Sequence, residues 1–208
     1  MMIIVKSPFR VSFFGGGTDF PEWFNKFGGQ VISSTINYHS YLLIDDNIQT
    51  KKYNFRYSVN EEVNHINSIK HPCFRNFCKY YKIKNININF HSDLPSFSGL
   101  ASSSSLSVGL INFYLKIRRK KKYSKYNLAS EAINFERNIM RENIGFQDQI
   151  SISYGGLNRI KFNNNAFKVN KLKINLKNKE FFEKNFFLLD TGIKRFSSLI
   201  QKNLIKSF

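Results

Sequence analysis

The chain has 208 residues, with 32 Lys and Arg against 14 Asp and Glu, which gives a formal net charge of +18. Hydrophobic residues make up 42% of the chain, enough for a packed core, and this excludes an intrinsically disordered protein. The N-terminal residues lack the apolar stretch of a signal peptide, and no apolar run is long enough to cross a bilayer. We therefore expect a globular, cytoplasmic protein that does not enter a membrane.

The positive charge has a compositional explanation. Lys, Asn, Ile and Phe are abundant together, as an A/T-rich genome would produce. The densest basic cluster, 118–122, falls where a helix is predicted to end, and cations there complement the C-terminal carbonyl groups. No nucleic-acid-binding motif accompanies the charge, so we expect no nucleic-acid partner, although a basic surface would suit substrates with several phosphates.

The N-terminal segment RVSFFGGGTDFPEWF combines a strand, a glycine-rich turn and a helix start. Arg10 lies on the predicted strand, and three glycines follow at 15–17. Thr18 and Asp19 stand just before Pro21, which fits the first turn of a helix. The pattern matches neither the P-loop nor the dinucleotide-binding loop. It predicts a tight turn that presents Asp19, a residue that can bind a sugar.

Cys73 and Cys78 are the only cysteines. With His71 they offer three ligands, which does not match a four-ligand zinc pattern. We expect both to be buried thiols and no structural metal here.

The segment Ser98–Leu110, SGLASSSSLSVGL, follows a predicted strand and begins a predicted helix. Alternating apolar residues in 86–90 indicate the strand, and Asp93 to Pro95 form the turn after it. The helix is indicated by apolar residues at helical spacing, Leu106, Leu110, Phe113 and Ile117. The four serines of 102–105 then lie at a helix N-terminus.

A helix N-terminus that is rich in hydroxyl groups and small residues is typical of an anion site. Its first backbone N–H groups have no partner in the helix, its dipole is positive, and Gly99 and Ala101 allow a polyphosphate to approach the main chain. One serine hydroxyl can also bind Mg²⁺. The alternative is that the serines only cap the helix, but one cap does not require four serines.

A second predicted helix carries Glu136 among apolar residues. Asn127 is its predicted N-cap, and the apolar stripe is Leu128, Ala132, Ile139 and Met140. A carboxylate in such a stripe is either paired with a cation, Arg137 or a more distant arginine, or a metal ligand. From position alone the ion pair is favoured.

Asp148 lies in the segment NIGFQDQISISYGG, between the glycines at 145 and 155–156. It stands at the start of a short helical or extended segment. It is either another N-cap or a general base for a hydroxyl that attacks a phosphoryl group.

The C-terminal third has weaker patterns. The Asn- and Lys-rich stretch 163–179 is a linker candidate, but partial alternation favours a hairpin at the sheet edge. A strand is predicted over 186–189 and a helix over 196–204. The alternating apolar residues of the predicted hairpin are Phe167, Val169, Leu172 and Ile174. The predicted C-terminal helix is expected to expose an apolar face formed by Leu199, Ile200, Leu204 and Phe208.

Taken in order, these segments resemble the galactokinase, homoserine kinase, mevalonate kinase and phosphomevalonate kinase (GHMP) family of small-molecule kinases. The first family motif resembles PFRVSFFGGGTDF (8–20), and the phosphate-binding motif P-x-x-x-G-L-G-S-S resembles LPSFSGLASSSSLSVGL. The acidic helix and GFQDQ complete the set. Within the family, these segments are most similar to kinases that phosphorylate D-glycero-D-manno-heptose 7-phosphate at its anomeric oxygen.

The resemblance implies ATP and Mg²⁺ as cofactors. Ser103 would bind Mg²⁺ with Glu136 as the second metal ligand, in place of the ion pair. Ala101 stands where the family loop has Gly, and a methyl group there would weaken phosphate contacts if the position needs a positive φ. The residues implied to bind the ATP phosphates are Gly99, Leu100, Ala101, Ser102, Ser103 and Ser104.

The resemblance also implies the catalytic and sugar-binding residues. Asp148 would orient or deprotonate the acceptor hydroxyl, with Arg10 beside it, and Gly17, Thr18 and Asp19 would bind the sugar. The implied reaction is in-line transfer of the γ-phosphoryl group of MgATP to the sugar hydroxyl. The alternatives are another GHMP sugar kinase, of the galactose or fucose type, and a non-catalytic sugar-phosphate-binding remnant.

The implied fold is α+β, a mixed sheet with helices packed on one side, as in the GHMP kinase N-terminal domain and the second domain of ribosomal protein S5. Residues 1–190 would form this ATP- and sugar-binding domain, and 191–208 would begin a truncated C-terminal domain. The third, Gly-rich family motif has no match in the chain. We therefore expect a homodimer or a separately encoded C-terminal partner.

Overall fold

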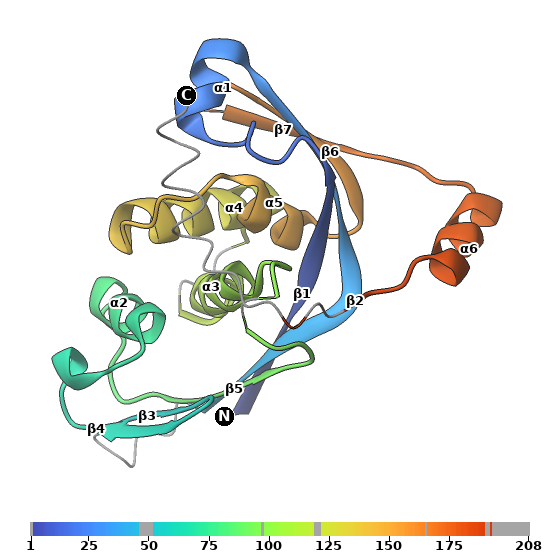
Figure 1. The fold of residues 1–208 in the computed structure, drawn as a ribbon. Helices are drawn as coiled ribbons and strands as arrows, with labels where there is room; N and C mark the ends of the chain where they lie inside the picture. The colour runs from blue at the N-terminus through green and yellow to red at the C-terminus, as the bar shows by residue number, and fades with distance from the viewer. Residues whose placement is uncertain are drawn as a thin grey trace.

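The structure is a computed structural model that describes residues 2–45, 52–96, 98–118, 122–164, 166–189 and 192. It has the expected α+β architecture, a mixed sheet with helices α2 to α5 packed on one face (Figure 1). The helices are α1 Pro21–Phe27, α2 Pro72–Tyr80, α3 Ser102–Phe113, α4 Lys125–Asn134, α5 Gln147–Tyr154 and α6 Leu176–Asn185, with a 3₁₀ turn η1 Ile66–Ser68 and π-helical turns η2 Tyr114–Arg118 and η3 Phe135–Ile139.

The sheet in the described part of the chain has seven strands in the order β4-β3-β5-β2-β6-β7, and β1 pairs with β2. All its pairs are antiparallel except β3 with β5. The strands are β1 Met2–Phe14, β2 Gly29–Asp45, β3 Tyr53–Arg56, β4 Asn60–Val63, β5 Asn87–Ser92, β6 Leu157–Asn163 and β7 Ala166–Lys171.

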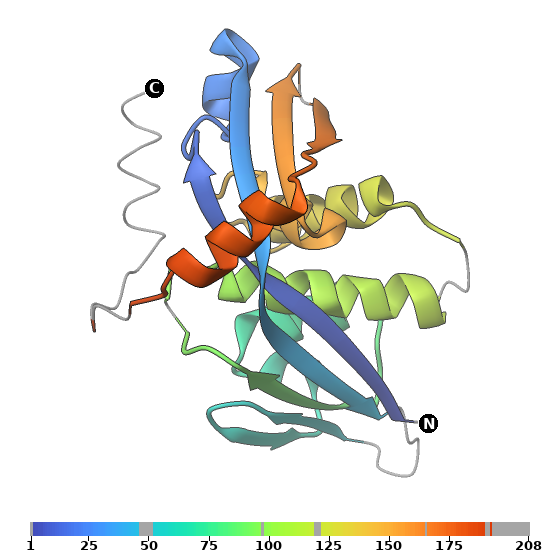
Figure 2. The ribbon, with the colours of Figure 1, turned by 90° about the vertical axis from the view of Figure 1, so that its right-hand side faces the viewer.

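The long strands β1 and β2 run the length of the sheet (Figure 2). One half of β2 pairs with β6 and the other half with β5, so this strand connects the two parts of the sheet. Alternate residues are buried within each half of β2, Val31 and Ser33 in the first half and Ser40, Leu42 and Ile44 in the second. β1 therefore carries Arg10, as predicted, in a rigid position beside the helices.

The core is built largely from aromatic and aliphatic side chains between the sheet and helices α2 to α4. Cys73 and Cys78 are buried free thiols within it, as expected. Gly109 brings α3 against the sheet, because a Cβ there would lie 2.9 Å from the Leu42 side chain and the Ser7 hydroxyl. Close contact between α3 and β1 fixes the start of α3 relative to Arg10.

Helix α4 begins earlier than the sequence suggested. Ser124 is its N-cap and forms a capping box with Asn127, which lies at the third helical position. The prediction of Asn127 as the N-cap was therefore wrong. The Asn side chain bonds the N-cap backbone instead of capping the helix itself.

The C-terminal third differs in part from the sequence expectation. The hairpin at the sheet edge is confirmed as β6 and β7, but Leu172 and Ile174 lie beyond β7, and α6 begins at Leu176. Residues 186–189 form no strand. α6 lies on the face of the sheet opposite α3 to α5 (Figures 1 and 2), where Phe186 contacts Phe13 edge-on. The helix predicted over 196–204 and the apolar face ending at Phe208 lie outside the described residues.

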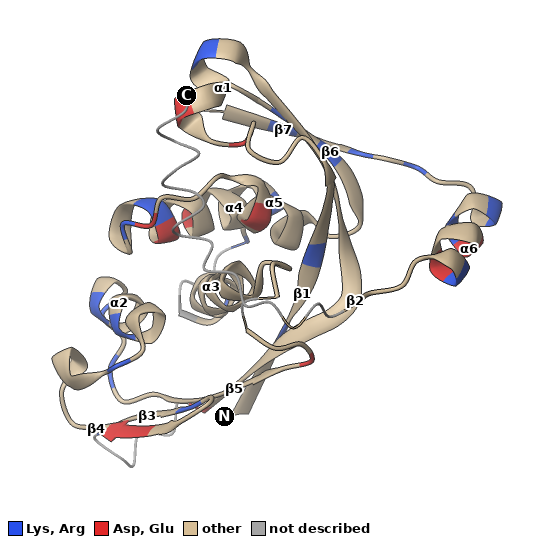
Figure 3. Cartoon of the chain, in the orientation of Figure 1, with Lys and Arg blue, Asp and Glu red and all other residues tan. Residues whose placement is uncertain are grey.

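Basic residues are distributed over α1, α2, β1 and α6 rather than gathered on one of these elements (Figure 3). Most of the basic cluster at 118–122 lies outside the described residues. Of the helices that the structure describes, none combines the length and apolar character needed to span a membrane.

Candidate active site

Helix α3 presents its N-terminus as the sequence predicted. Gly99 and Ala101 have φ angles of +75° and +64°, so the chain turns sharply into Ser102. A Cβ on Gly99 would meet nothing within 4 Å, which leaves this side of the loop accessible to a phosphate. The N-cap is Ala101, and no side chain caps the helix, so the interpretation of the serines as simple caps is wrong.

The four serines divide into an inner and an outer pair. Ser104 and Ser105 are buried, and the Ser104 hydroxyl donates to Glu136 Oε2 at 3.0 Å. Ser105 contacts the Ser40 hydroxyl at 2.6 Å. Ser102 is half-buried and Ser103 is exposed. The residue that the structure brings to Glu136 is therefore Ser104, while Ser103, the expected magnesium ligand, faces the outside of the loop.

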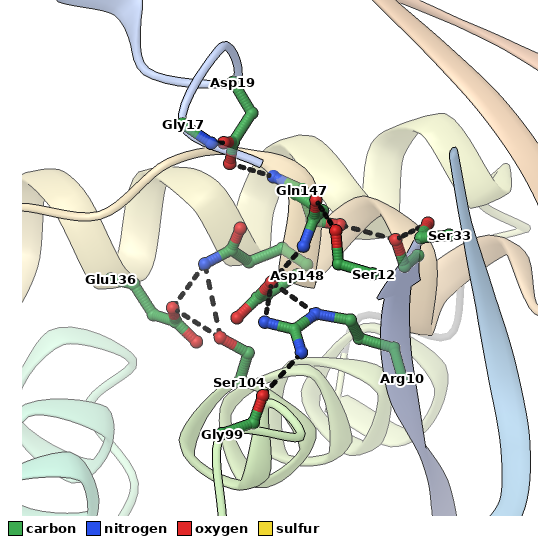
Figure 4. Close-up of polar contacts among 12 residues, drawn as sticks. Arg10, Ser12, Gly17, Asp19, Ser33, Gly99, Ser104, Glu136, Gln147 and Asp148 are labelled. Atoms are coloured by element: carbon green, nitrogen blue, oxygen red, sulfur yellow. Dashed lines mark hydrogen bonds and ion pairs between the residues drawn. The ribbon is translucent and has the colours of Figure 1, made fainter. Parts of the chain in front are cut away.

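Arg10 joins the phosphate loop to Asp148 (Figure 4). Its Nε and Nη2 lie 2.7 and 2.6 Å from Asp148 Oδ1, and its Nη1 donates to the Gly99 carbonyl at 2.8 Å. Its backbone N–H donates to the Leu100 carbonyl. Asp148 lies in the first turn of α5, whose N-cap is Phe146, so the N-cap interpretation of Asp148 is wrong.

Asp19 lies above this pair and is 6% exposed. The Gly17 N–H donates to its Oδ1 at 3.1 Å and the Gln147 N–H to its Oδ2 at 3.0 Å. Burial raises the pKa of the Asp19 carboxyl despite these bonds. A Cβ on Gly145 would lie 1.9 Å from Asp19 Oδ2, so only glycine allows the α5 loop to approach this carboxylate.

A cavity of about 150 Å³ separates the glycine turn from α5. Thr18 does not line it, because its hydroxyl lies within hydrogen-bond distance of the Gly15 and Gln30 carbonyls and holds the turn. The cavity is lined by Arg10, Gly16, Gly17, Asp19, Phe20, Ile144, Gly145, Gln147 and Asp148.

Glu136 lies on the π-helical turn η3 and is 1% exposed. Burial, followed by the nearby charge of Glu142, raises its pKa to about 8, although the hydrogen bonds from Gln149 and Ser104 oppose this rise. Arg137 pairs with Glu22 at 2.7 Å, so the predicted pair with Arg137 is wrong. Within the described ranges, Glu136 has no ion pair with a Lys or an Arg.

Part of the chain that forms this site matches a known protein family. Residues 67–156 match the family described as "GHMP kinases N terminal domain". This part of the chain is therefore similar to a GHMP kinase N-terminal domain.

A curated protein is similar to a larger part of the chain. The chain is 30% identical over 188 residues to the D-glycero-alpha-D-manno-heptose 7-phosphate kinase of Campylobacter jejuni, with 83% of this chain and 54% of that protein covered. The chain therefore spans about half the length of this curated relative.

Solved structures support the fold. A D-glycero-D-manno-heptose 1-phosphate kinase from Bacteriodes thetaiotaomicron superposes with a TM-score of 0.73 at 22% identity, over 84% of this chain and 61% of that one. A putative sugar kinase from Campylobacter jejuni superposes with a TM-score of 0.66 at 26% identity, over 88% and 59%.

The donor set of this site fits a magnesium ion that accompanies ATP. Glu136 Oε1 is buried and has no hydrogen-bond partner within the described residues, as a metal-binding oxygen would require. Carboxylate and hydroxyl oxygens are the ligands that Mg²⁺ prefers, and Glu136, Ser103 and Ser104 supply both kinds at one helix terminus.

Sequence reasoning missed the two glutamines on either side of Asp148. The Gln147 side chain accepts from the Ser12 hydroxyl at 2.8 Å and donates to Asp148 Oδ1 at 3.3 Å. Gln149 bonds Glu136 and Ser104. The QDQ triplet places both next to the catalytic candidate, but only the fold shows that one faces the cavity and the other faces Glu136.

Proposed function

We propose that the chain is the N-terminal part of an ATP-dependent sugar kinase. It would transfer the γ-phosphoryl group of MgATP to the anomeric hydroxyl of D-glycero-D-manno-heptose 7-phosphate. The residues proposed to bind ATP are Gly99, Leu100, Ala101, Ser102, Ser103 and Ser104. Those proposed for the sugar are Gly17 and Asp19, with Thr18 holding the turn that carries them.

The observation that carries this proposal is the contact of Arg10 with both Asp148 and the Gly99 carbonyl. One guanidinium group thereby links the carboxylate beside the sugar cavity to the loop at the positive end of α3. A kinase needs the acceptor hydroxyl and the γ-phosphoryl group in line, and this contact supports the proposal because it joins the proposed phosphate loop to the proposed catalytic carboxylate.

The arrangement supports a specific proton path. Arg10 and Gln147 both bond Asp148 Oδ1, which leaves Oδ2 to accept the proton of the attacking sugar hydroxyl. The sugar oxygen then bonds the γ-phosphorus, and the bond to the ADP oxygen breaks. Arg10 stabilises negative charge on the transferring group. When bound, Mg²⁺ would neutralise the phosphate oxygens, with Glu136 and Ser103 as its proposed protein ligands.

The proposed domain organisation follows the resemblance. Residues 1–190 would form the ATP- and sugar-binding domain, and 191–208 would begin a second domain. We also propose a homodimer or a separately encoded C-terminal partner. Exposed apolar side chains on and after α6, among them Phe181, Phe187 and Leu189, support a covered surface there.

The test is a phosphotransfer assay with the purified chain, MgATP and heptose 7-phosphate, read by ³¹P NMR. We expect a new anomeric phosphate signal that Asp148→Asn abolishes and that the surface variant Glu183→Gln leaves unchanged. Transfer to galactose or fucose alone would indicate another GHMP sugar kinase. Sugar-phosphate binding without turnover, unaffected by Asp148→Asn, would indicate a non-catalytic binding protein.

A further inference from the structure

Gln149 lies on α5 next to Asp148, and its wholly buried side chain faces the carboxylate of Glu136. Its side-chain Nε2 donates to Glu136 Oε2, and the same nitrogen lies 3.4 Å from the Ser104 hydroxyl oxygen. The Ser104 hydroxyl also donates to Glu136 Oε2. Ser104 from α3 and Gln149 from α5 thus both bond the same carboxylate oxygen of Glu136 on η3.

The donor and acceptor roles in this cluster are determined by chemistry. A serine hydroxyl has one hydrogen, and Ser104 gives it to Glu136, so the Ser104 oxygen can only accept. A carboxylate oxygen also accepts. The side chain that faces both must supply N–H groups, so the amide of Gln149 has one possible orientation, with its nitrogen toward Glu136.

The cluster leaves the other carboxylate oxygen free. Glu136 Oε1 is buried and has no hydrogen-bond partner in the described part of the chain. Buried polar atoms are nearly always paired, and a carboxylate oxygen left without a partner beside the first turn of α3 can bind a positively charged ligand. Glu136 also lies on a π-helical turn, a distortion that is frequent at functional sites.

We propose that Gln149 is a positioning residue for the metal site. By holding Oε2, its amide prevents the carboxylate from rotating and presents Oε1 to the divalent cation. This inference rests on the proposed function, because it takes Glu136 as a ligand of the cation that accompanies ATP. Gln149 itself touches neither cation nor substrate in this proposal and acts through Glu136.

A purely structural role would have different consequences. If Gln149 only joined α5 to η3, its loss would lower stability without changing metal affinity in the folded protein. Ser151 provides the matched control, since it lies on the same helix, is 1% exposed, and bonds the Ser33 hydroxyl at 2.6 Å and not Glu136. Ser151→Ala therefore removes a buried polar contact of α5 outside the cluster.

The experiment compares the full chain with Gln149→Met and Ser151→Ala. Mn²⁺ binding is titrated by electron paramagnetic resonance, alone and with a non-hydrolysable ATP analogue, and binding of the analogue is also measured in EDTA. We expect Gln149→Met to weaken Mn²⁺ binding about tenfold, as losses of supporting contacts around metal ligands do. Binding in EDTA and the Mn²⁺ affinity of Ser151→Ala should match the wild type.

A double-mutant cycle shows whether Gln149 acts through Glu136. We expect Gln149→Met to cause no further loss of Mn²⁺ affinity in a Glu136→Gln background. Additive losses, or wild-type Mn²⁺ affinity in Gln149→Met, would overturn the inference. If Gln149→Met does not fold, Gln149→Asn, whose shorter amide cannot reach Oε2, must show the same loss.

The two proposals fail in different ways. A wild-type chain that binds Mn²⁺ neither alone nor with nucleotide overturns the positioning role together with the metal site. Mn²⁺ binding that depends on Glu136 and Gln149, without phosphotransfer to any sugar, overturns only the proposed reaction and supports the positioning role.

Discussion

Two buried glutamates, Glu61 on strand β4 and Glu136 at the start of η3, show how differently one residue type is used in this fold. The Glu61 carboxylate accepts from the Tyr57 hydroxyl and from the backbone N–H groups of Lys70 and His71, the latter two at 2.6 and 3.1 Å. Both its oxygens are occupied. In Glu136, one oxygen receives every bond and the other receives none within the described residues.

The pKa values of the two carboxyls differ accordingly. Burial raises the pKa of Glu61, but its three hydrogen bonds together outweigh burial and leave the pKa below its usual value. Burial dominates at Glu136 and raises the pKa to about 8. The comparison teaches that a buried carboxylate with complete hydrogen bonding supports the fold, whereas one with a free oxygen is prepared for a ligand.

The largest expected effect is that of Glu136→Gln on metal binding. Loss of the charged oxygen should weaken metal-dependent nucleotide binding about 100-fold, the upper range for changes around a metal site. The free energy of unfolding should stay the same or rise, since the amide replaces a carboxyl whose charged form is disfavoured by burial. Mn²⁺ titration and urea unfolding measure the two quantities. If Glu136→Gln unfolds easily but binds metal normally, Glu136 supports the fold as Glu61 does, and the proposed difference between the two glutamates is wrong.

The matched change, Glu61→Gln, should show the reverse. A neutral amide cannot accept from all three donors, and its own N–H groups would face backbone N–H groups at the start of α2. We expect a loss of about 2 kcal/mol in unfolding free energy, as for other buried groups left unsatisfied. Urea unfolding tests this, and metal-dependent nucleotide binding of the folded variant should be unchanged. A selective loss of that binding would contradict a structural role.

The sequence distinguished these glutamates only in part. Glu136 was found because it interrupts an apolar helical stripe, a pattern visible without a structure. Glu61 lies in the polar segment NEEV, and its burial arises from pairing with β3 and from the approach of α2. Such contacts between distant segments leave no local pattern.

The same limit applies within the candidate site. The strand before Ser98, the edge hairpin and the helix start at Ser102 were predictable from periodicity and turn residues, whereas the mixed sheet was implied by the family resemblance. Ser104 rather than Ser103 contacts Glu136, because the left-handed conformation of Ala101 sets the rotation of the first turn of α3. The contacts of Gln147 and Gln149 depend on how α5 packs, which no glutamine pattern indicates. α6 was missed, as none of its residues is buried.

Asp19 is an intermediate case, and Gly145→Ala tests it. Both Asp19 oxygens are bonded, yet the carboxylate lines the cavity. The new methyl group would overlap Asp19 Oδ2 and displace it. We therefore expect sugar-phosphate affinity to fall roughly tenfold or more, as it does when a hydrogen bond to a charged group is lost. Isothermal titration with heptose 7-phosphate and with MgATP separates the effects. An equal loss for MgATP would mean that the alanine disturbs α5 as a whole.

The smallest expected effect is on the pH dependence of stability, and here Glu61 and Asp19 should differ in sign. The lowered pKa of Glu61 means that its stabilising contribution is present above the unfolded-state value of 4.5 and is lost as the pH falls through its folded-state pKa. The raised pKa of Asp19 means that its contribution is present below 3.8 and is lost as the pH rises through its folded-state pKa.

Urea unfolding of wild type, Glu61→Gln and Asp19→Asn between about pH 3 and about pH 7 tests this difference. The advantage of the wild type over Glu61→Gln should shrink toward the acidic end, because both side chains are then neutral. Its stability relative to Asp19→Asn should instead decline toward neutral pH, where the wild type holds a buried charge that the amide lacks. Parallel pH profiles for the two variants would mean that hydrogen bonding does not separate the structural carboxylate from the one at the cavity.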